Sequence, residues 1–195
     1  MSKYSSSQKS TPSSLYFISG NAGKINEFKE LLQPFNVVSK KIELPEIQST
    51  ICLEVVEEKV KAGKGLIEGP YFIEDTGLYI TSPPMNNFPG ALIKFYYEHL
   101  GCEGICQKNG GDKAYVETII GYHDGKKSHY FKGQTHGIIA EKPQGSLGFG
   151  WDAIFIPDDE NPDRLSFAEL STEVKNRISM RSRASKLFLE KLSCD

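Results

Sequence analysis

A strand, a glycine-containing turn and a helix follow one another early in the chain, and this unit constrains the fold most. Leu15–Ile18 is a short aromatic and β-branched run, which predicts a buried strand. The turn that follows, 19–24, reads Ser-Gly-Asn-Ala-Gly-Lys, and its Ser19 or Asn21 could cap a helix. The predicted helix ends at Pro34, and its apolar stripe comprises Ile25, Phe28, Leu31 and Leu32. Strand–turn–helix units of this kind are typical of α/β proteins.

Further strands and helices alternate along the chain. Strands are predicted at 37–38, 71–73, 114–122, 128–135, 137–140 and 153–156, and helices at 53–66, 93–97 and 169–192. The turn Asp124-Gly125 joins two of these strands as a hairpin. A hairpin beside strand–helix units predicts an α/β protein whose sheet is mixed and not purely parallel.

Length and composition indicate how the chain is divided. It has 195 residues, which predicts a single domain, and we place this domain at residues 15–195. Residues 1–14 include seven serines and almost no apolar side chain. Such a segment cannot offset the entropy of ordering, so we expect a disordered tail there.

Charge, hydropathy and cysteine content exclude several classes of protein. The net charge of −2 is unlike that of a nucleic-acid coat protein or a polybasic membrane binder. No apolar run approaches the roughly 20 residues of a membrane span, and the N-terminal residues lack the apolar core of a secretion signal. Four cysteines do not suggest a disulfide scaffold in a chain of this length. We therefore expect a cytoplasmic protein with reduced thiols.

The turn 19–24 is a candidate anion site. At the N-terminus of a helix, backbone N–H groups point outward and the helix dipole favours negative charge, and Lys24 would add a mobile cation. The segment is not a Walker A loop, because Ile18 stands where that loop needs glycine and Ile25 where it needs Ser or Thr. An ordinary strand-to-helix turn is the alternative interpretation.

Carboxylates near two predicted strand ends are candidate metal ligands. Glu74-Asp75-Thr76 follows the predicted strand 71–73, so we expect it at the C-terminal end of that strand, where α/β sheets place ligands. If the strand continued, Glu74 and Asp75 would face opposite ways, and only one would face the site directly. Glu46 follows Leu44-Pro45 in a stiff loop, and together with Asp75 it would suit Mg²⁺. Taken alone, each carboxylate also fits a solvated loop or turn.

An aromatic, glycine-containing loop and a basic segment could bind a nucleotide. In Phe149-Gly150-Trp151-Asp152, a planar base could stack on an aromatic ring while the carboxylate accepts hydrogen bonds, although a core aromatic loop is the alternative. The basic residues of the last predicted helix are Lys175, Arg177, Arg181, Arg183 and Lys186. They are either a solvated face or donors to phosphate or to a base carbonyl.

Six short motifs in order resemble those of the inosine triphosphate pyrophosphatase family, over residues 15–192. They are Ser19-Gly20-Asn21-Ala22-x-Lys24-x-x-Glu27, Leu44-Pro45-Glu46, Glu74-Asp75-Thr76-Gly77-Leu78, Pro89-Gly90, Phe149-Gly150-Trp151-Asp152 and Glu173-x-Lys175-Asn176-x-x-Ser179-x-Arg181. The resemblance implies an elongated, twisted mixed sheet flanked by helices, two lobes with a central active-site cleft, and a homodimer. It also implies hydrolysis of the triphosphates of inosine, deoxyinosine and xanthosine to monophosphate and pyrophosphate, with Mg²⁺ or alternatively Mn²⁺.

The resemblance also implies roles for individual positions. The phosphates would be held by Ser19, Gly20, Asn21, Ala22, Gly23 and Lys24. Glu46 and Asp75 would bind the metal, and Asp75 and Lys24 would be catalytic, with Asp75 as the proton acceptor. Further substrate contacts would come from Lys59, Thr76, Lys94 and Lys175. The base would be held by Phe149, Gly150, Trp151, Asp152, Met180 and Arg181.

One position departs from the family pattern. The family usually has Ser-His-Arg where this chain has Ser179-Met180-Arg181, and methionine cannot donate a hydrogen bond to a base carbonyl. A broader-specificity nucleotide pyrophosphatase with a relaxed base pocket is therefore the main alternative. A non-enzymatic nucleotide-binding module is disfavoured because Glu46 and Asp75 are both present, and a nucleic-acid binder is disfavoured by the net charge.

Overall fold

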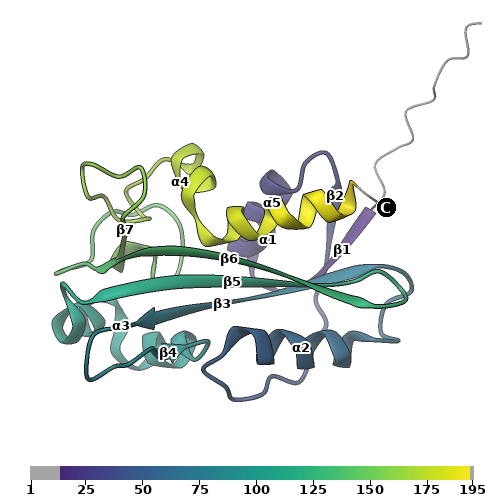
Figure 1. Ribbon diagram of the computed structural model, residues 1–195, viewed down its shortest axis with the longest axis horizontal. Coiled ribbons are helices and arrows are strands. Elements are labelled where there is room, and N and C mark those ends of the chain that lie inside the picture. Colours follow the sequence, from purple (N-terminus) through teal and green to yellow (C-terminus); the bar gives the residue numbers. More distant parts are fainter. Residues whose placement is uncertain (1–13, 194–195) are drawn as a thin grey trace, which may run out of the picture.

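The computed structural model describes residues 14–193 (Figure 1). The strands are β1 (Ser14–Ile18), β2 (Asn36–Lys40), β3 (Tyr71–Ile80), β4 (Phe88–Gly90), β5 (Lys113–His123), β6 (Ser128–Ile139) and β7 (Phe155–Pro157). The helices are α1 (Ala22–Leu31), α2 (Cys52–Gly63), α3 (Ile93–Asn109), α4 (Thr172–Ile178) and α5 (Met180–Leu192), with a short 3₁₀ turn at Asp152–Ile154. The predicted tail lies outside the described residues except for Ser14, which is the first residue of β1.

The strands form one open sheet in the order β2-β1-β3-β5-β6-β7, with β4 paired to β3. β1 runs parallel to β2 and β3, whereas the other neighbouring pairs are antiparallel. The long strands β3, β5 and β6 run along the length of the molecule and twist strongly (Figure 1). The predicted α/β class with a mixed, elongated and twisted sheet is confirmed.

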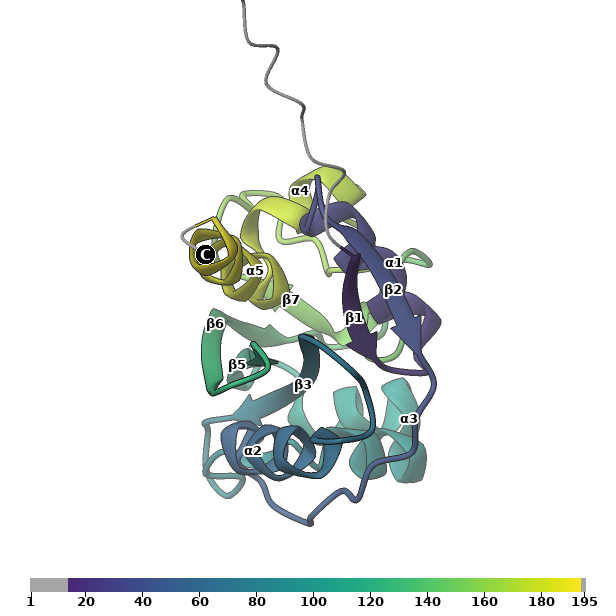
Figure 2. The ribbon, with the colours of Figure 1, turned by 90° about the vertical axis from the view of Figure 1, so that its right-hand side faces the viewer.

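Helices cover both sides of the long strands. α1, α4 and α5 lie on one side, and α2 and α3 lie on the other (Figures 1 and 2). On the first side, the Phe72 ring of β3 stacks on Phe17 of β1 at 4.5 Å and contacts Phe28 of α1 and Phe188 of α5. On the second side, α2 buries Val56 and Val60 against β5. These two apolar layers hold the polar middle of β3 between them.

β3 is longer than the sequence predicted. The expected strand 71–73 continues to Ile80, so Glu74, Asp75 and Thr76 lie in the middle of a strand and not at its C-terminal end. The pairing of β3 with β5 is unbroken from Tyr71 to Ile80. Two adjacent carboxylates can lie in a buried strand only where cations neutralise them, and those cations come from segments far away in the sequence.

The C-terminal helix is also different from the prediction. The expected helix 169–192 is two helices, α4 and α5, separated at Ser179, whose backbone is extended (ψ 152°). The Ser179 hydroxyl caps α5 by accepting from the Ser182 N–H at 3.2 Å, and Thr135 donates to the Ile178 carbonyl at 2.7 Å. The start of α5 packs on β6 at Gly133, where an added β-carbon would lie only 2.0 Å from the Met180 carbonyl oxygen.

Two smaller predictions are corrected as well. The expected separate strand 137–140 is the end of β6, which continues without a break from Ser128 to Ile139. The clustered prolines Pro83, Pro84 and Pro89 predict a rigid loop that includes Gly90, but Pro89-Gly90 is part of β4 and pairs with β3. Both corrections lengthen the sheet around β3 and β5.

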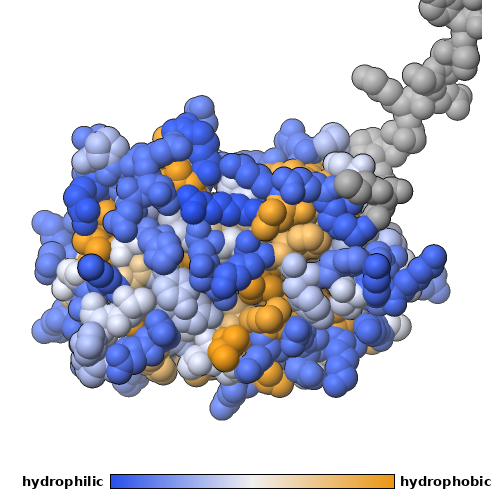
Figure 3. All heavy atoms as spheres, viewed as in Figure 1, coloured by the Kyte–Doolittle hydropathy of each residue, from blue (hydrophilic) through white to orange (hydrophobic). Residues whose placement is uncertain are grey.

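The face shown in Figure 3 is mostly hydrophilic, with hydrophobic side chains gathered in a patch that runs from its upper to its lower part, near the centre of the view. Among residues 14–193, no helix has the length and apolar character that crossing a membrane requires.

Candidate active site

A cavity of about 740 Å³ brings most of the predicted site residues together. It is lined by Ser19, Gly20, Asn21, Lys24, Glu46, Lys59, Asp75, Thr76, Lys94, Phe149, Gly150, Trp151, Asp152, Met180 and Arg181. The walls therefore come from the β1–α1 turn, the loop after β2, α2, β3, α3, the loop before β7, and α5. Ala22, Gly23 and Lys175 are the predicted residues that do not line it.

The turn between β1 and α1 forms part of the cavity wall. Asn21 caps α1, because its Oδ1 accepts from the Lys24 N–H at 3.1 Å, while the Ser19 hydroxyl accepts from the Asn21 N–H at 3.2 Å. Ala22 and Gly23 are the first two residues of the helix, so they offer backbone groups and not side chains. This part of the wall is thus a helix N-terminus with Lys24 beside it, an arrangement that favours anions.

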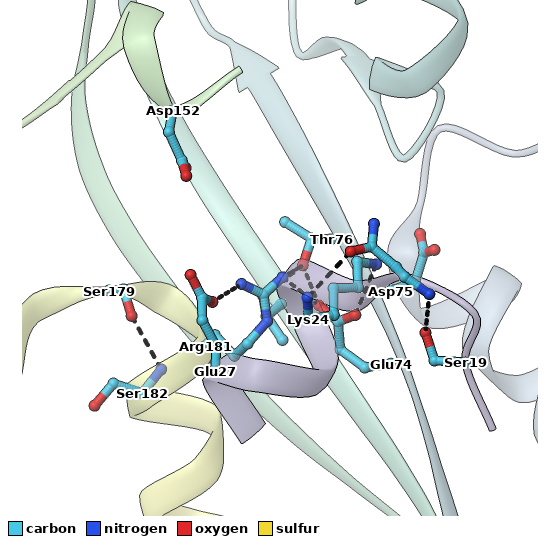
Figure 4. Close-up of polar contacts among 12 residues, drawn as sticks. Ser19, Lys24, Glu27, Glu74, Asp75, Thr76, Asp152, Ser179, Arg181 and Ser182 are labelled. Carbon is cyan, nitrogen blue, oxygen red and sulfur yellow. Dashed lines mark hydrogen bonds and ion pairs between the residues drawn. The ribbon is translucent and has the colours of Figure 1, made fainter. Parts of the chain in front are cut away.

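Glu74 lies at the centre of a buried charge network (Figure 4). Its side chain is completely buried and pairs with Lys24 at 2.7 Å and with Arg181 Nη2 at 2.9 Å. Arg181 also donates to Thr76 Oγ1 at 3.2 Å and pairs with Glu27 of α1. Arg181, although fully buried, is therefore held by two carboxylates.

Glu27 extends this network to α4 and to the loop before β7. Its other oxygen accepts from Lys175 Nζ at 2.8 Å, and Lys175 donates to Asp152 Oδ2 at 2.7 Å. Asp152 Oδ2 also accepts from the Phe149 N–H at 2.8 Å. Lys175, predicted to contact the substrate, is not among the residues that line the cavity and joins Glu27 to Asp152.

Asp75 faces the α2 side of β3, opposite to Glu74. Its Oδ1 lies 3.2 Å from Lys59 Nζ, and the same nitrogen lies 2.9 Å from Glu46 Oε2. The Glu46 side chain is 53% exposed. The two predicted metal ligands are therefore brought together around one cation at the open side of the cavity. Both neighbours on β3 border the cavity, although the Glu74 side chain is completely buried.

The two neighbouring carboxyl groups have opposite pKa shifts. Burial raises the pKa of Asp75, and the charge of Glu74 adds to this, although Lys24 and Lys59 act in the other direction. Burial would raise the pKa of Glu74 too, but Lys24 and Arg181 outweigh it and lower the pKa to about 2. Neighbouring carboxyl groups whose pKa values shift in opposite directions are typical of sites where one group takes part in proton transfer.

The residues present fit a divalent cation. Glu46 and Asp75 offer two carboxylate oxygens within reach of a single positive charge, as Lys59 shows. Within residues 14–193, no group of three or more His, Cys, Asp or Glu side chains could hold a metal alone. A donor set of two carboxylates fits Mg²⁺, which is usually bound by one or two carboxylates together with substrate phosphates and water.

Another part of the cavity wall is aromatic. Phe149 and Trp151 line it, and the Trp151 ring meets Phe155 edge-on at 6.4 Å. Met180 is 2% exposed and packs in the apolar cluster that also includes Phe155 and Phe167. An apolar, aromatic wall in the same cavity as a cationic turn suits a planar base joined to phosphates.

Sequence reasoning missed Glu27 and Lys41 as candidates, and it considered Glu74 but gave it no role. Glu74 and Glu27 stood inside recognised motifs, but their partners Lys24, Arg181 and Lys175 lie on other elements. Glu27 lies three residues after Lys24 on α1, and this shared helix face was an available signal. Lys41, which lines the cavity with its side chain 3.5 Å from the Cβ position of Gly20, gave no such signal.

Comparisons with known proteins identify the family of this chain. The model of the Ham1 family matches residues 15–191. The dITP/XTP pyrophosphatase of Thermococcus kodakarensis is 40% identical over 179 residues, covering 89% of this chain and 94% of the relative. The inosine triphosphate pyrophosphatase of Kluyveromyces lactis is 37% identical over 182 residues, covering 87% and 91%.

Solved structures show the same fold. The Ham1 protein of Staphylococcus aureus is 26% identical with a TM-score of 0.70, covering 93% of this chain and 98% of that one. A HAM1 protein from Coxiella burnetii is 24% identical with a TM-score of 0.74, covering 93% and 99%. The resemblance carried by the six motifs is thus confirmed, and the chain belongs to the Ham1 family.

Proposed function

We propose that this protein hydrolyses deaminated purine nucleoside triphosphates, those of inosine, deoxyinosine and xanthosine, to the monophosphate and pyrophosphate. One observation carries the proposal. A single cavity is lined by a helix N-terminus with Lys24, by the Glu46–Asp75 pair, and by the aromatic residues Phe149 and Trp151. The relatives named as dITP/XTP and inosine triphosphate pyrophosphatases support it.

The cationic part of the wall binds the triphosphate in this proposal. The N-terminus of α1 supplies backbone N–H groups, and Lys24, Lys59 and Lys94 supply positive charge. Lys24 and Lys59 are paired with carboxylates, so bound phosphate oxygens would share these cations with Glu74 and Asp75. The developing charge on the departing pyrophosphate is offset in the same way.

Glu46 and Asp75 would hold Mg²⁺, or alternatively Mn²⁺. A bound divalent ion neutralises phosphate charge and lowers the pKa of a coordinated water.

Asp75 is the proton acceptor in this proposal. It lines the cavity beside Lys59, where a carboxylate oxygen is placed to take a proton from the attacking water. The water oxygen forms a new bond to phosphorus, and the pyrophosphate leaves with the electrons of the broken anhydride bond. Glu74 takes no part in this step, because its carboxylate is held by Lys24 and Arg181.

Base selection is assigned to Arg181 and Asp152. Four of the five N–H donors of Arg181 lie on the two nitrogens that Glu27 and Glu74 hold, and Nε has no partner among the described residues. Nε is itself buried, so the assignment of Arg181 to the 6-carbonyl of hypoxanthine or xanthine rests on the resemblance and requires the side chain to be freed on binding. Adenine has an amino donor at that position and would leave the Arg181 donor unpaired, at a cost of about 1–3 kcal/mol.

A relaxed base pocket is the second candidate. Met180 is buried beside the cavity and offers only apolar surface and a weak sulfur acceptor toward a base. An apolar wall discriminates poorly between bases that differ in a donor or acceptor. This observation favours broader specificity with the same chemistry.

A homodimer and a cytoplasmic location complete the proposal. The resemblance supports the dimer, and substrates from the free nucleotide pool suit the location. Light scattering of the purified protein after size-exclusion chromatography should give the mass of two chains. A mass of one chain at all concentrations would remove the dimer from the proposal.

A panel of substrates tests the proposed function. We would incubate the protein with Mg²⁺ and the triphosphates of inosine, xanthosine, guanosine and adenosine separately, and identify the products. We expect monophosphate and pyrophosphate, mainly from the inosine and xanthosine substrates. The same products from all four would support the relaxed pocket, whereas diphosphate and phosphate, or no turnover, would refute the proposed chemistry.

A further inference from the structure

The aromatic loop (149–152) and the phosphate turn (19–24) meet at a contact between Phe149 and Gly23. A β-carbon built on Gly23 would lie 2.5 Å from Phe149 Cδ1 and 2.7 Å from Cε1 and Cγ. Carbon atoms without a bond between them cannot approach so closely, so the ring is seated directly on the backbone of the first turn of α1. Any side chain at residue 23 would displace it.

Glycine is otherwise a poor choice at this place. Gly23 is the second residue of α1, where glycine is less favourable than alanine because it loses more conformational freedom on folding. No positive φ requires glycine there, unlike at Gly148 or Gly150. The contact with Phe149 is therefore what distinguishes glycine from alanine at this position.

Other contacts fix the Phe149 ring from its remaining sides. Its backbone N–H is bound by Asp152 Oδ2. The charged groups of Lys175 and Arg181 lie 5.3 Å and 5.8 Å from the ring centre, within the range of cation–π attraction. The loop is held closely here as well, because a β-carbon on Gly148 would lie 2.2 Å from Asp152 Oδ2. A ring displaced from Gly23 must therefore move against the loop and both cations.

We propose that Gly23 is a positioning residue for base recognition. Its missing side chain lets the Phe149 ring seat on α1, and this contact sets the separation between the aromatic loop and the phosphate turn. The role of Gly23 in catalysis rests on the proposed function, because it assumes that the base binds at the aromatic loop and the phosphates bind at the turn. The contact itself does not depend on the substrate.

The only tryptophan of the chain reports this contact without any substrate. Trp151 lies two residues after Phe149 and lines the cavity. We expect Gly23→Ala to push the loop outward, which raises the quenching of Trp151 fluorescence by acrylamide. Asn26→Ala is the matched control: it raises helix propensity in the same helix, but at an exposed residue. It should leave the quenching unchanged.

A double-substitution cycle shows whether the β-carbon acts through the ring. In a Phe149→Ala background the obstructed ring is gone, so adding Gly23→Ala should have no further effect on quenching. If Gly23→Ala alone does not fold, the double variant should fold, because the overlap has been removed. Failure of both variants to fold, or an equal effect of Gly23→Ala in both backgrounds, would overturn the proposal.

Kinetics provide the catalytic readout. Overpacking of this size should raise the KM of Gly23→Ala for inosine triphosphate about tenfold, with a smaller change in kcat, since the reacting groups are not touched. Quenching and KM both equal to those of the wild type would also refute the proposal. Absence of pyrophosphate release by the wild type would instead refute the proposed function, while the quenching cycle still tests the role of Gly23.

Discussion

Each side of β3 carries a carboxylate that pairs with basic side chains, but the two carboxylates differ in their surroundings. On one side, Glu74 is completely buried and held by Lys24 and Arg181. On the other, Asp75 shares Lys59 with Glu46, whose side chain is half exposed. The first carboxylate has its pKa lowered to about 2, whereas that of the second is raised.

This difference shows how one strand can supply both a scaffold and a reactive group. A carboxylate held by two buried cations cannot be released cheaply, because breaking the pairs leaves uncompensated buried charge. A carboxylate at the open side can exchange its lysine for a metal or a proton. We therefore assign structure to the Glu74 side and chemistry to the Asp75 side.

The largest expected effect is on turnover at the Asp75 side. Asp75→Asn removes the proton acceptor and one metal ligand, so turnover of inosine triphosphate should fall at least about 100-fold. Binding should persist, because the phosphate turn and the aromatic loop are intact, and isothermal titration calorimetry measures it. Glu43→Gln, at an exposed residue lining the same cavity, is the control and should keep full activity. Turnover of Asp75→Asn at the wild-type rate would refute the assignment.

The next effect is on stability at the Glu74 side. Glu74→Gln leaves Lys24 and Arg181 without their shared charge partner, so the free energy of unfolding should fall by about 3–5 kcal/mol. Urea denaturation measures this loss. Glu160→Gln breaks an exposed pair with Arg177 and should cost less than about 1 kcal/mol. Equal losses in the two variants would show that the buried network has no special role.

Substitution of Arg181 tests whether the buried network around Glu74 also influences base selection. Arg181→Ala removes the donor assigned to the base carbonyl, so the kcat/KM ratio of inosine to adenosine triphosphate should fall about tenfold. The variant is assayed well below its unfolding temperature, since Glu27 and Glu74 lose a partner. Arg177→Ala, at an exposed residue, should leave the ratio unchanged. An unchanged ratio in Arg181→Ala would remove this residue from the base site.

The smallest expected effect is a pH dependence of stability from Glu27. Burial would raise the pKa of Glu27, but Arg181 and Lys175 lower it overall. Its stabilising contribution is therefore complete above the ordinary carboxyl range and is lost as the pH falls through the pKa of the folded state. Urea denaturation from about pH 7 to about pH 3 should show a steeper loss for the wild type than for Glu27→Gln. Parallel curves would contradict this expectation.

Local patterns predicted the elements that depend on near neighbours. β1, the capped helix α1 and the β5–β6 hairpin follow from residues close together in the sequence, and the structure confirms them. The cap at Asn21 is one of the two that the sequence allowed.

The features that the sequence did not predict depend on residues far apart in the chain. β3 continues through Glu74 and Asp75 because Lys24, Lys59 and Arg181 neutralise them from three other elements. The break between α4 and α5 depends on Thr135 and Gly133 of β6. The cavity joins most of the predicted site residues, but Lys175 does not line it and instead pairs with Asp152, an arrangement that no spacing along the chain indicates.

One product assay tests the division of roles along β3 most directly. Wild type, Glu74→Gln and Asp75→Asn are incubated with inosine triphosphate and Mg²⁺ at a temperature where all three are folded, and pyrophosphate is measured. We predict pyrophosphate from the wild type and from Glu74→Gln, and almost none from Asp75→Asn. Release of pyrophosphate by Asp75→Asn at the rate of Glu74→Gln would contradict the assignment of the chemistry to Asp75.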